Sequence, residues 1–310
     1  MSVRKWRRIH VLFFVAVVLL MGESAFAQGP PINTETALLA GFTNAFRTFD
    51  QEIDRSGDLP GGVRGDLHVR AVPMIFPYAI TQGKLVIAGV IPYFNKKLDL
   101  HRPAGTTRLE ENGFGDLRLL AEYAYYIKDE KEKTTRAMVI GGFDLPTGSH
   151  GDHNLPPGLW NGSGATNYLI GTAFSYIPAR WGFYTDLIYR ITTEGSGFEF
   201  GDTLRYDLAV GYRPWPAIYE IYPSPQVNLF LELNGFWEQR SRDFRPPGSG
   251  NKVPDSGGNT IFLSPGIQWV PTGRAFLVEA SVQIPTVENL NGEQLETDAQ
   301  FNIGLRWLVF

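Results

Sequence analysis

The chain of 310 residues has no cysteine. Disulfide bonds, cysteine nucleophiles and zinc–cysteine sites are therefore excluded. Beyond residue 27 the chain also lacks the runs of basic residues on which nucleic-acid binding depends. Loss of residues 1–27 would remove four basic residues and Glu23, so the formal charge would change from −4 to −7. These absences leave a mildly acidic chain and argue against nucleic acid as a partner.

After Gln28 there is no apolar run long enough for a transmembrane helix, which needs about 20 residues. The mean hydropathy of −0.13 is ordinary for a soluble protein. A membrane β-barrel has a similarly neutral average, because lipid-facing and lumen-facing side chains alternate along each strand. Average hydropathy therefore does not separate these two classes of protein.

The first 27 residues have the three parts of an export signal. Basic residues crowd positions 4–8, an apolar run covers residues 9–21, and Ala25-Phe26-Ala27 forms a small-x-small cleavage site. The apolar run is shorter than a membrane-spanning helix requires, so we expect cleavage after Ala27 and not a helical anchor. The chain is thus predicted to comprise a signal peptide, residues 1–27, and a mature protein, residues 28–310.

The last ten residues have the pattern of a membrane strand. Apolar side chains fall on every second position, with polar ones between them; the apolar set is Phe301, Ile303, Leu305 and Trp307. Half of such a strand faces lipid and half faces a wet lumen. Phe310 is out of phase, and it joins the outward set only if an extra residue is bulged out near Leu308. With the export signal, this ending predicts a bacterial outer-membrane β-barrel.

The same alternation recurs along the mature chain, for example in residues 114–127, 202–213 and 274–285. It predicts an all-β, transmembrane, antiparallel up-and-down barrel of about 12 strands, most of them as long as a tilted membrane strand requires. The predicted strands are residues 36–49, 64–79, 84–98, 114–127, 134–146, 165–177, 181–193, 202–213, 226–239, 259–270, 274–285 and 298–310.

The connections between these strands alternate in length. Short ones follow the second, fourth, sixth and tenth strands, and long ones rich in Gly, Pro, Asp and Asn follow the odd-numbered strands. Short periplasmic turns, long extracellular loops and periplasmic termini would produce this pattern. A soluble β-sandwich is the alternative, and it would need the outward aromatic residues to form a second core.

Aromatic residues cluster near the predicted strand ends. Rings with one polar edge favour the lipid headgroup level, so these residues are expected to form girdles, with ordinary strand-end packing as the alternative. They are Tyr125, Tyr126, Tyr176, Trp181, Trp215, Tyr219, Tyr222, Trp237, Trp269 and Trp307.

Short motifs follow one another over residues 64–310. They are Asn112-Gly113-Phe114-Gly115-Asp116-Leu117, Phe143-Asp144-Leu145-Pro146-Thr147-Gly148, Gly201-Asp202, Asp255-Ser256-Gly257-Gly258-Asn259-Thr260 with Leu263-Ser264-Pro265-Gly266, and Val282-Gln283-Ile284-Pro285. Together they resemble the outer-membrane family known as "MetA-pathway of phenol degradation", a set of channel or transport proteins. The resemblance implies an outer-membrane barrel, often encoded beside pathways for aromatic compounds, and it implies no catalytic residue.

Charged side chains on the inward phase are the candidate functional set. They would either line an open pore or pair across a narrow lumen and close it, and both alternatives stay open. Tyr184, Phe230 and Phe262 share this phase and would offer stacking surface to an aromatic solute. The charged set is Asp116, Arg118, Glu122, Arg136, Asp144, Asp186, Arg190, Arg205, Asp207, Arg213, Glu232, Glu279 and Arg306.

Catalytic and metal-binding alternatives rest on few residues. His150-Gly151-Asp152-His153 could catch a divalent metal, although a solvated loop is the favoured interpretation. A lipase-type barrel enzyme would need histidine and serine on the lipid-facing side. The phase of His68 predicts that its side chain faces the lumen. Gly162-Ser163-Gly164 lacks the strand-turn-helix setting of a nucleophile elbow. We therefore expect no enzymatic activity, no cofactor and no metal.

The sequence as a whole predicts a channel in the outer membrane of a Gram-negative bacterium. Small molecules, with aromatic or hydrophobic compounds as candidates, would pass by facilitated diffusion. The expected partners are outer-membrane lipids, the solute and the barrel-assembly machinery, which would act on the terminal strand during insertion. The alternatives are a plugged structural barrel and a lipase-type barrel enzyme.

Overall fold

The computed structural model describes residues 31–34, 44–81, 84–152, 154–218, 224–245, 250–271 and 276–309. The expected signal peptide, residues 1–27, lies outside these described residues. Four single residues that carry sequence-based expectations also lie outside them: His153, Tyr219, Tyr222 and Phe310.

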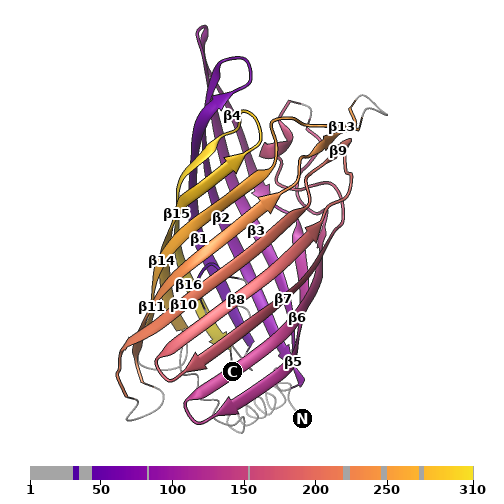
Figure 1. Ribbon diagram of the computed structural model, residues 1–310. Helices are drawn as coiled ribbons and strands as arrows, with labels where there is room; N and C mark the ends of the chain where they lie inside the picture. The colour runs from indigo at the N-terminus through magenta and orange to yellow at the C-terminus, as the bar shows by residue number, and fades with distance from the viewer. Residues whose placement is uncertain are drawn as a thin grey trace, which may run out of the picture.

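The long strands form one antiparallel sheet that closes on itself as a barrel, because β2 pairs with both β1 and β3 (Figure 1). β4 and β5 pair with successive parts of β3 and act as one strand, interrupted at Gly115 and Asp116. The 13-stranded sheet is therefore a 12-stranded barrel, which confirms the predicted fold class. Its strands are β1 (Asn44–Leu59), β2 (Val63–Ile80), β3 (Leu85–Arg102), β4 (Gly105–Phe114), β5 (Leu117–Glu130), β6 (Lys133–Leu145), β7 (Asn167–Pro178), β8 (Trp181–Ile191), β10 (Thr203–Trp215), β11 (Gln226–Glu238), β14 (Gly258–Val270), β15 (Phe276–Leu290) and β16 (Glu296–Val309).

Side chains alternate between two environments along each barrel strand. On β10, Asp207 and Ala209 are buried, whereas Leu208 and Val210 are exposed on the outer face. Successive side chains of a strand point to opposite faces, so one face meets lipid and the other meets the lumen. The polar and apolar phases predicted for residues 202–213 therefore match the structure.

Three loops are joined at one end of the barrel, which we call the loop rim. Their described residues are 146–152 with 154–166, 192–202, and 239–245 with 250–257. The guanidinium carbon of Arg245 lies 5.6 Å from the ring centroids of both Trp160 and Phe198. Hydrogen bonds from the Arg245 side chain also hold the pKa of Asp243 below its usual range. A small sheet links the second and third of these loops and contains β9 (Phe198–Glu199), β12 (Arg242–Asp243) and β13 (Asn251–Lys252).

The first of these loops contains a single 3-10 turn, η3 (Pro157–Leu159). Within the described residues, no helix is both long and apolar enough to cross a membrane. At the opposite end of the barrel, which we call the turn rim, β2 meets β3, β5 meets β6, and β7 meets β8.

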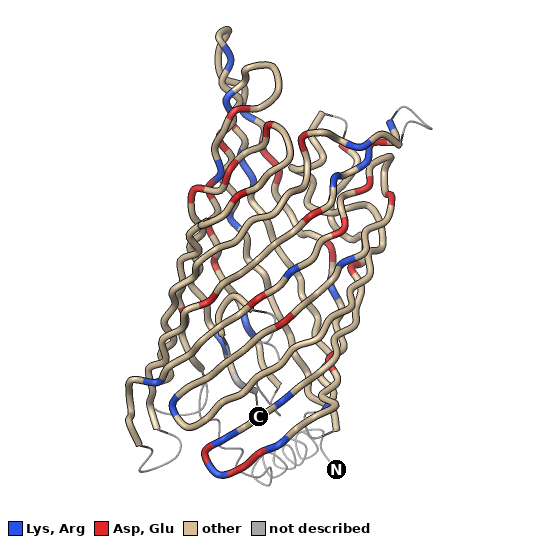
Figure 2. Tube along the Cα trace, viewed as in Figure 1, with Lys and Arg blue, Asp and Glu red and all other residues tan. Residues whose placement is uncertain are grey.

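Three of the predicted long loops are wrong. The first strand, predicted over residues 36–49, is described from residue 44 onward as β1 and continues to Leu59, and residues 99–114 extend β3 and form β4. The connection after the eleventh predicted strand is also short, because only residues 291–295 lie between β15 and β16. Ion pairs bridge these extensions on their outer face, with Arg70 and Arg108 each 2.7 Å from an aspartate. Figure 2 shows charged residues along the hairpins that project at the loop rim. The apolar alternation ends where the lipid-facing surface ends, but the main-chain pairing continues.

The carboxy-terminal strand pairs with β1 in an unbroken register from Trp307 to Val309. The register therefore contains no bulge at Leu308, which was the condition for Phe310 to join the outward set. The register shift between these strands lies at Asp54 and Arg55, close to the loop rim.

Aromatic side chains ring the outer face near the turn rim. Trp181, Trp215, Trp269 and Trp307 lie at or near strand ends, and each is about half exposed. A register shift after Ala124 places both Tyr125 and Tyr126 on the outer face. Amphipathic rings at this level suit the boundary between hydrocarbon and headgroups.

Replacing Leu208 by Arg is expected to lower the free energy of unfolding by roughly 2 to 4 kcal/mol, because a charge in the middle of β10 would face hydrocarbon. Denaturant unfolding of the barrel refolded into lipid vesicles measures the change. Gln300→Arg is the matched control, since Gln300 lines a polar cavity on the inner face. Equal losses in the two variants would show that the two faces are assigned wrongly.

Candidate functional site

The charged residues predicted for the lumen lie on the inner face of the barrel, and the structure brings several of them together. Arg136 approaches Asp129, with 3.6 Å between Nη2 and Oδ2, and Arg213 donates to the Pro216 carbonyl at 3.2 Å. Glu122, Asp186, Asp207, Arg213, Glu232, Glu279 and Arg306 are buried, and Asp116, Arg118, Arg136, Arg190 and Arg205 are partly buried.

A first cluster surrounds Glu279 on β15. Its two carboxylate oxygens accept hydrogen bonds from Arg47 Nε at 2.7 Å, Gln268 Nε2 at 3.1 Å and Arg306 Nη2 at 3.3 Å. Arg47 and Arg306 are almost fully buried, so this carboxylate supplies their countercharge. Sequence reasoning missed Arg47, although it has the same phase as Phe49 in the predicted first strand.

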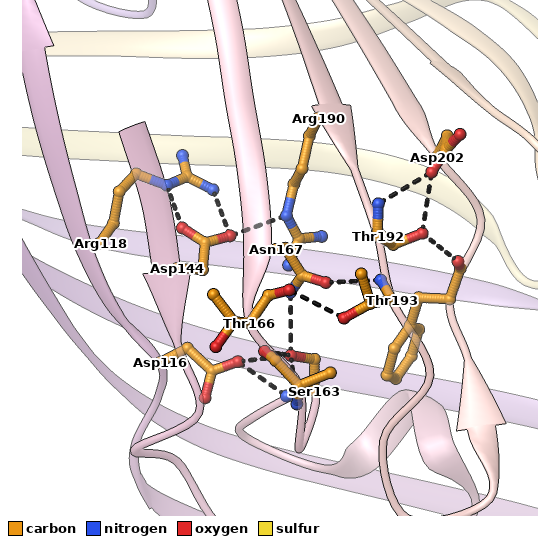
Figure 3. A network of polar contacts seen from close by, with 12 residues as sticks. Asp116, Arg118, Asp144, Ser163, Thr166, Asn167, Arg190, Thr192, Thr193 and Asp202 are labelled. Carbon is orange, nitrogen blue, oxygen red and sulfur yellow. Dashed lines mark hydrogen bonds and ion pairs between the residues drawn. The ribbon is translucent and has the colours of Figure 1, made fainter. Parts of the chain in front are cut away.

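A second cluster surrounds Asp144 on β6 (Figure 3). Arg118 donates from Nε at 2.7 Å and from Nη2 at 3.3 Å, and Arg190 donates from Nε at 2.7 Å. One buried carboxylate thus holds two arginines from different strands, β5 and β8. Both arginines remain partly exposed towards the lumen.

Asp116 belongs to a separate network that fastens the first loop to the barrel (Figure 3). It accepts hydrogen bonds from Gly148 N at 3.0 Å and from Ser163 N and Oγ at 2.8 Å each. Asn167 Nδ2 donates to the same Ser163 Oγ at 2.9 Å. A Cβ at Gly162 would lie 2.5 Å from Asp116 Oδ1, so the approach requires glycine. Asp116 and Ser163 therefore hold the loop rim together.

Residues 31–34, which we call the inner segment, lie inside the barrel against Glu232 on β11. One Glu232 oxygen accepts the Ile32 backbone N–H at 2.9 Å, and the other accepts the Asn33 backbone N–H at 3.1 Å. Arg47 Nη2 donates to the Ile32 carbonyl at 2.8 Å, and Arg205 Nη2 donates to the Asn33 carbonyl. Buried main-chain groups require such partners, so charges of the wall hold the segment in the lumen.

The side chains of the inner segment are held as well. Asn33 Oδ1 accepts hydrogen bonds from Ser281 Oγ and Asn302 Nδ2, each at 3.0 Å. Ile32 packs in a buried cluster that includes Tyr184 and Phe230. The expectation that Tyr184 and Phe230 offer stacking surface to a solute is therefore wrong, because the inner segment covers them.

A cavity of about 600 Å³ lies between the inner segment and the loop rim. Its wall includes Phe262, as predicted from the inward phase, and two residues that sequence reasoning missed, Arg55 and Phe236. Phe236 shares the inward phase of Glu232 and Asn234, so the alternation along this strand predicts that its side chain faces the lumen. Arg55 was missed because the first strand was predicted to end too early.

The histidines give no metal centre within the described residues. His150 Nδ1 lies 2.8 Å from Ser196 Oγ, and the described part of the chain has no group of three or more His, Asp or Glu side chains placed to hold a metal ion. The predicted inward phase of His68 is wrong. His68 shares the outer face with Asp54, 2.7 Å away, because the projecting hairpins are polar on their outer side too.

Comparisons with known proteins agree with this architecture. The family described as "Putative MetA-pathway of phenol degradation" matches residues 48–293. The crystal structure of an outer membrane channel from Pseudomonas putida F1 is 15% identical, covers 93% of this chain and 100% of its own, and has a TM-score of 0.59. The β-domain of the Bordetella autotransporter BrkA is 12% identical, covers 86% of this chain and 100% of its own, and has a TM-score of 0.44. The CymD monoaromatic hydrocarbon channel is 9% identical, covers 93% of this chain and 95% of its own, and has a TM-score of 0.41. No curated protein matches the chain.

Proposed function

The chain belongs to the MetA-pathway of phenol degradation family, and from this premise we propose that it is an outer-membrane channel through which small molecules pass by facilitated diffusion. The route runs from the loop rim through the lumen cavity to the turn rim. The observation that carries the proposal is a cavity of about 600 Å³, lined by polar and charged side chains, inside a wall whose outer face is apolar. Its volume is in the range of small-molecule sites.

The similar barrel from Pseudomonas putida F1 is named as a channel, which supports the same function here. Lipids surround the apolar outer face, and small solutes enter the lumen. Aromatic and hydrophobic compounds are the first candidates, because Phe262 and Phe236 line the cavity beside the charges.

A structural barrel is the second candidate, and the inner segment favours it. Residues 31–34 lie across the lumen with hydrogen bonds to β1, β10, β11, β15 and β16. A 12-stranded barrel is narrow, so this one segment fills much of its cross-section. The two functions differ in whether this segment can leave its place.

The channel is tested by planar-bilayer recording of the purified, refolded chain. We expect discrete conductance steps, and we expect Arg118→Ala to shift ion selectivity towards cations, because a positive charge facing the lumen is lost while Arg190 still holds Asp144. Arg64→Ala on the outer face of the projecting hairpin is the control and should leave selectivity unchanged. Absence of conductance under all voltages would favour the structural barrel.

Export is proposed to depend on residues 1–27, with cleavage after Ala27, and insertion on the barrel-assembly machinery. Outer-membrane fractions should contain a heat-modifiable band whose amino-terminal sequence begins at Gln28. A protein that starts at Met1, or that is recovered from the periplasm, would contradict this proposal.

A further inference from the structure

The lumen cavity pairs an exposed ring with hydrogen-bond donors. Phe236 faces inward opposite Arg205 in the register of β10 and β11, yet 42% of its surface is exposed. Ile188 is the register partner of Arg205 on the other side and also lines the cavity. Burial of this accessible ring against the flat face of a ligand would be favourable. This part of the wall therefore suits the flat face of an aromatic solute.

Arg190 lies beside this apolar patch, and the N–H groups of its two terminal nitrogens are available as hydrogen-bond donors. Its Nε donates to Asp144, but its two terminal nitrogens donate no hydrogen bond to any described residue. Asp144 is held independently by two donors of Arg118. Arg190 can therefore turn its terminal N–H groups towards a solute without leaving Asp144 unpaired.

Arg55 is a second available donor on the opposite wall. It lines the cavity and forms no hydrogen bond or ion pair with any residue that the structure describes. The charges of Glu238 and Glu288 act on it from β11 and β15. Glu238 also lies within electrostatic range of Arg190, so these two arginines border the same region.

Apart from Glu238, the acidic groups of this region are less available than Arg55 and Arg190. Asp144 and Asp207 are buried, and their oxygens accept hydrogen bonds from Arg118, Arg190, Arg205 and Asn234. Glu288 accepts the Thr297 backbone N–H at 3.0 Å. The cavity wall includes five arginines and two glutamates: Arg47, Arg55, Arg118, Arg190, Arg205, Glu238 and Glu288. A solute in the cavity thus meets mainly N–H donors.

We propose that this cavity binds small aromatic carboxylates. The ring lies against Phe236, which is the accessible apolar side chain here because Ile188 is largely buried. The carboxylate accepts hydrogen bonds from the terminal nitrogens of Arg190, with Arg55 facing it. Arginine forks match carboxylate oxygens in geometry and charge. The inference rests on the proposed channel function for the route by which the solute arrives, but the binding itself does not require conduction.

Binding is measured by fluorine NMR titration of the folded full chain in detergent with three probes of equal ring size: 4-fluorobenzoate, 4-fluorobenzyl alcohol and 4-fluorobenzylamine. Empty micelles give the background. We expect saturable binding of 4-fluorobenzoate, with the alcohol and the amine about tenfold weaker or worse, since loss of a charge-assisted hydrogen bond costs about a factor of ten or more. Binding of the cationic amine tests whether the negative charges of Glu238 and Glu288 dominate the cavity over the positive charges of the arginines.

Arg190→Gln is expected to weaken 4-fluorobenzoate binding about tenfold while the barrel still folds, because Arg118 keeps Asp144 paired. Phe236→Leu tests the ring contact separately and should weaken binding of 4-fluorobenzoate more than binding of trifluoroacetate, a fluorinated carboxylate without a ring. Arg64→Gln, on the outer face, is the control and should bind like the wild type. Heat-modifiable migration reports folding of each variant.

Equal binding of acid and alcohol, tighter binding of the amine, or unchanged binding in Arg190→Gln would each overturn the carboxylate site. Wild-type protein that binds the acid selectively but conducts no current would support the site and refute the channel. Conductance without saturable binding of 4-fluorobenzoate would support the channel and refute the site.

Discussion

Deletion of residues 31–34 is expected to raise the single-channel conductance several-fold. These residues hydrogen-bond to Glu232, Arg47, Arg205, Ser281 and Asn302, which lie on five different strands around the lumen. Because they form the floor of the cavity, their removal would join the cavity to the turn rim. Planar-bilayer recording of the wild-type and shortened chains measures the difference.

Glu232→Gln is the graded companion to this deletion. The Glu232 carboxylate accepts N–H groups of both Ile32 and Asn33, whereas an amide keeps one acceptor oxygen and places two donors there. We expect more frequent openings than in the wild type but a smaller open state than in the deletion. If the deletion leaves the conductance unchanged, the inner segment does not obstruct the passage. If the shortened chain conducts no current at all, the barrel is structural.

Glu279→Ala is expected to lower the free energy of unfolding by about 3 to 5 kcal/mol, the usual cost of breaking a buried ion pair. The substitution would leave Arg47 and Arg306, both almost fully buried, without their shared countercharge. Gln268 would lose a hydrogen-bond acceptor as well. Denaturant unfolding of the barrel in vesicles measures the loss, and Glu110→Ala on an exposed part of β4 is the control.

The triple variant Arg47→Met, Glu279→Leu, Arg306→Met separates uncompensated charge from lost packing. Replacing a whole buried ionic cluster by apolar side chains is often close to neutral. We therefore expect the triple variant to be more stable than Glu279→Ala alone. A triple variant that is less stable than Glu279→Ala would mean that the arginines stabilise the fold through contacts other than those to Glu279.

Much of the barrel follows from local sequence, because each strand must satisfy lipid on one face and polar surroundings on the other. The alternation along residues 202–213, with Leu208 between Asp207 and Ala209, predicts a strand and its two faces. The same reasoning gave the number of strands and the inward position of Glu279 and Asp144. It failed to predict β4 and the part of β1 that lies beyond the lipid. Main-chain pairing continues there, although the alternation of apolar and polar side chains has ended.

The sequence alone therefore determined the barrel, its two faces and many residues of its inner wall, since side-chain direction in a strand is a local property with a period of two. Only the tertiary structure decided which inner residues meet. Arg47 and Glu279 pair although 232 positions separate them, because closure of the barrel brings β1, β15 and β16 together. It also decided that residues 31–34 cover Tyr184 and Phe230 but leave Phe236 accessible. Such contacts cross the lumen, and their partners depend on how the whole sheet closes.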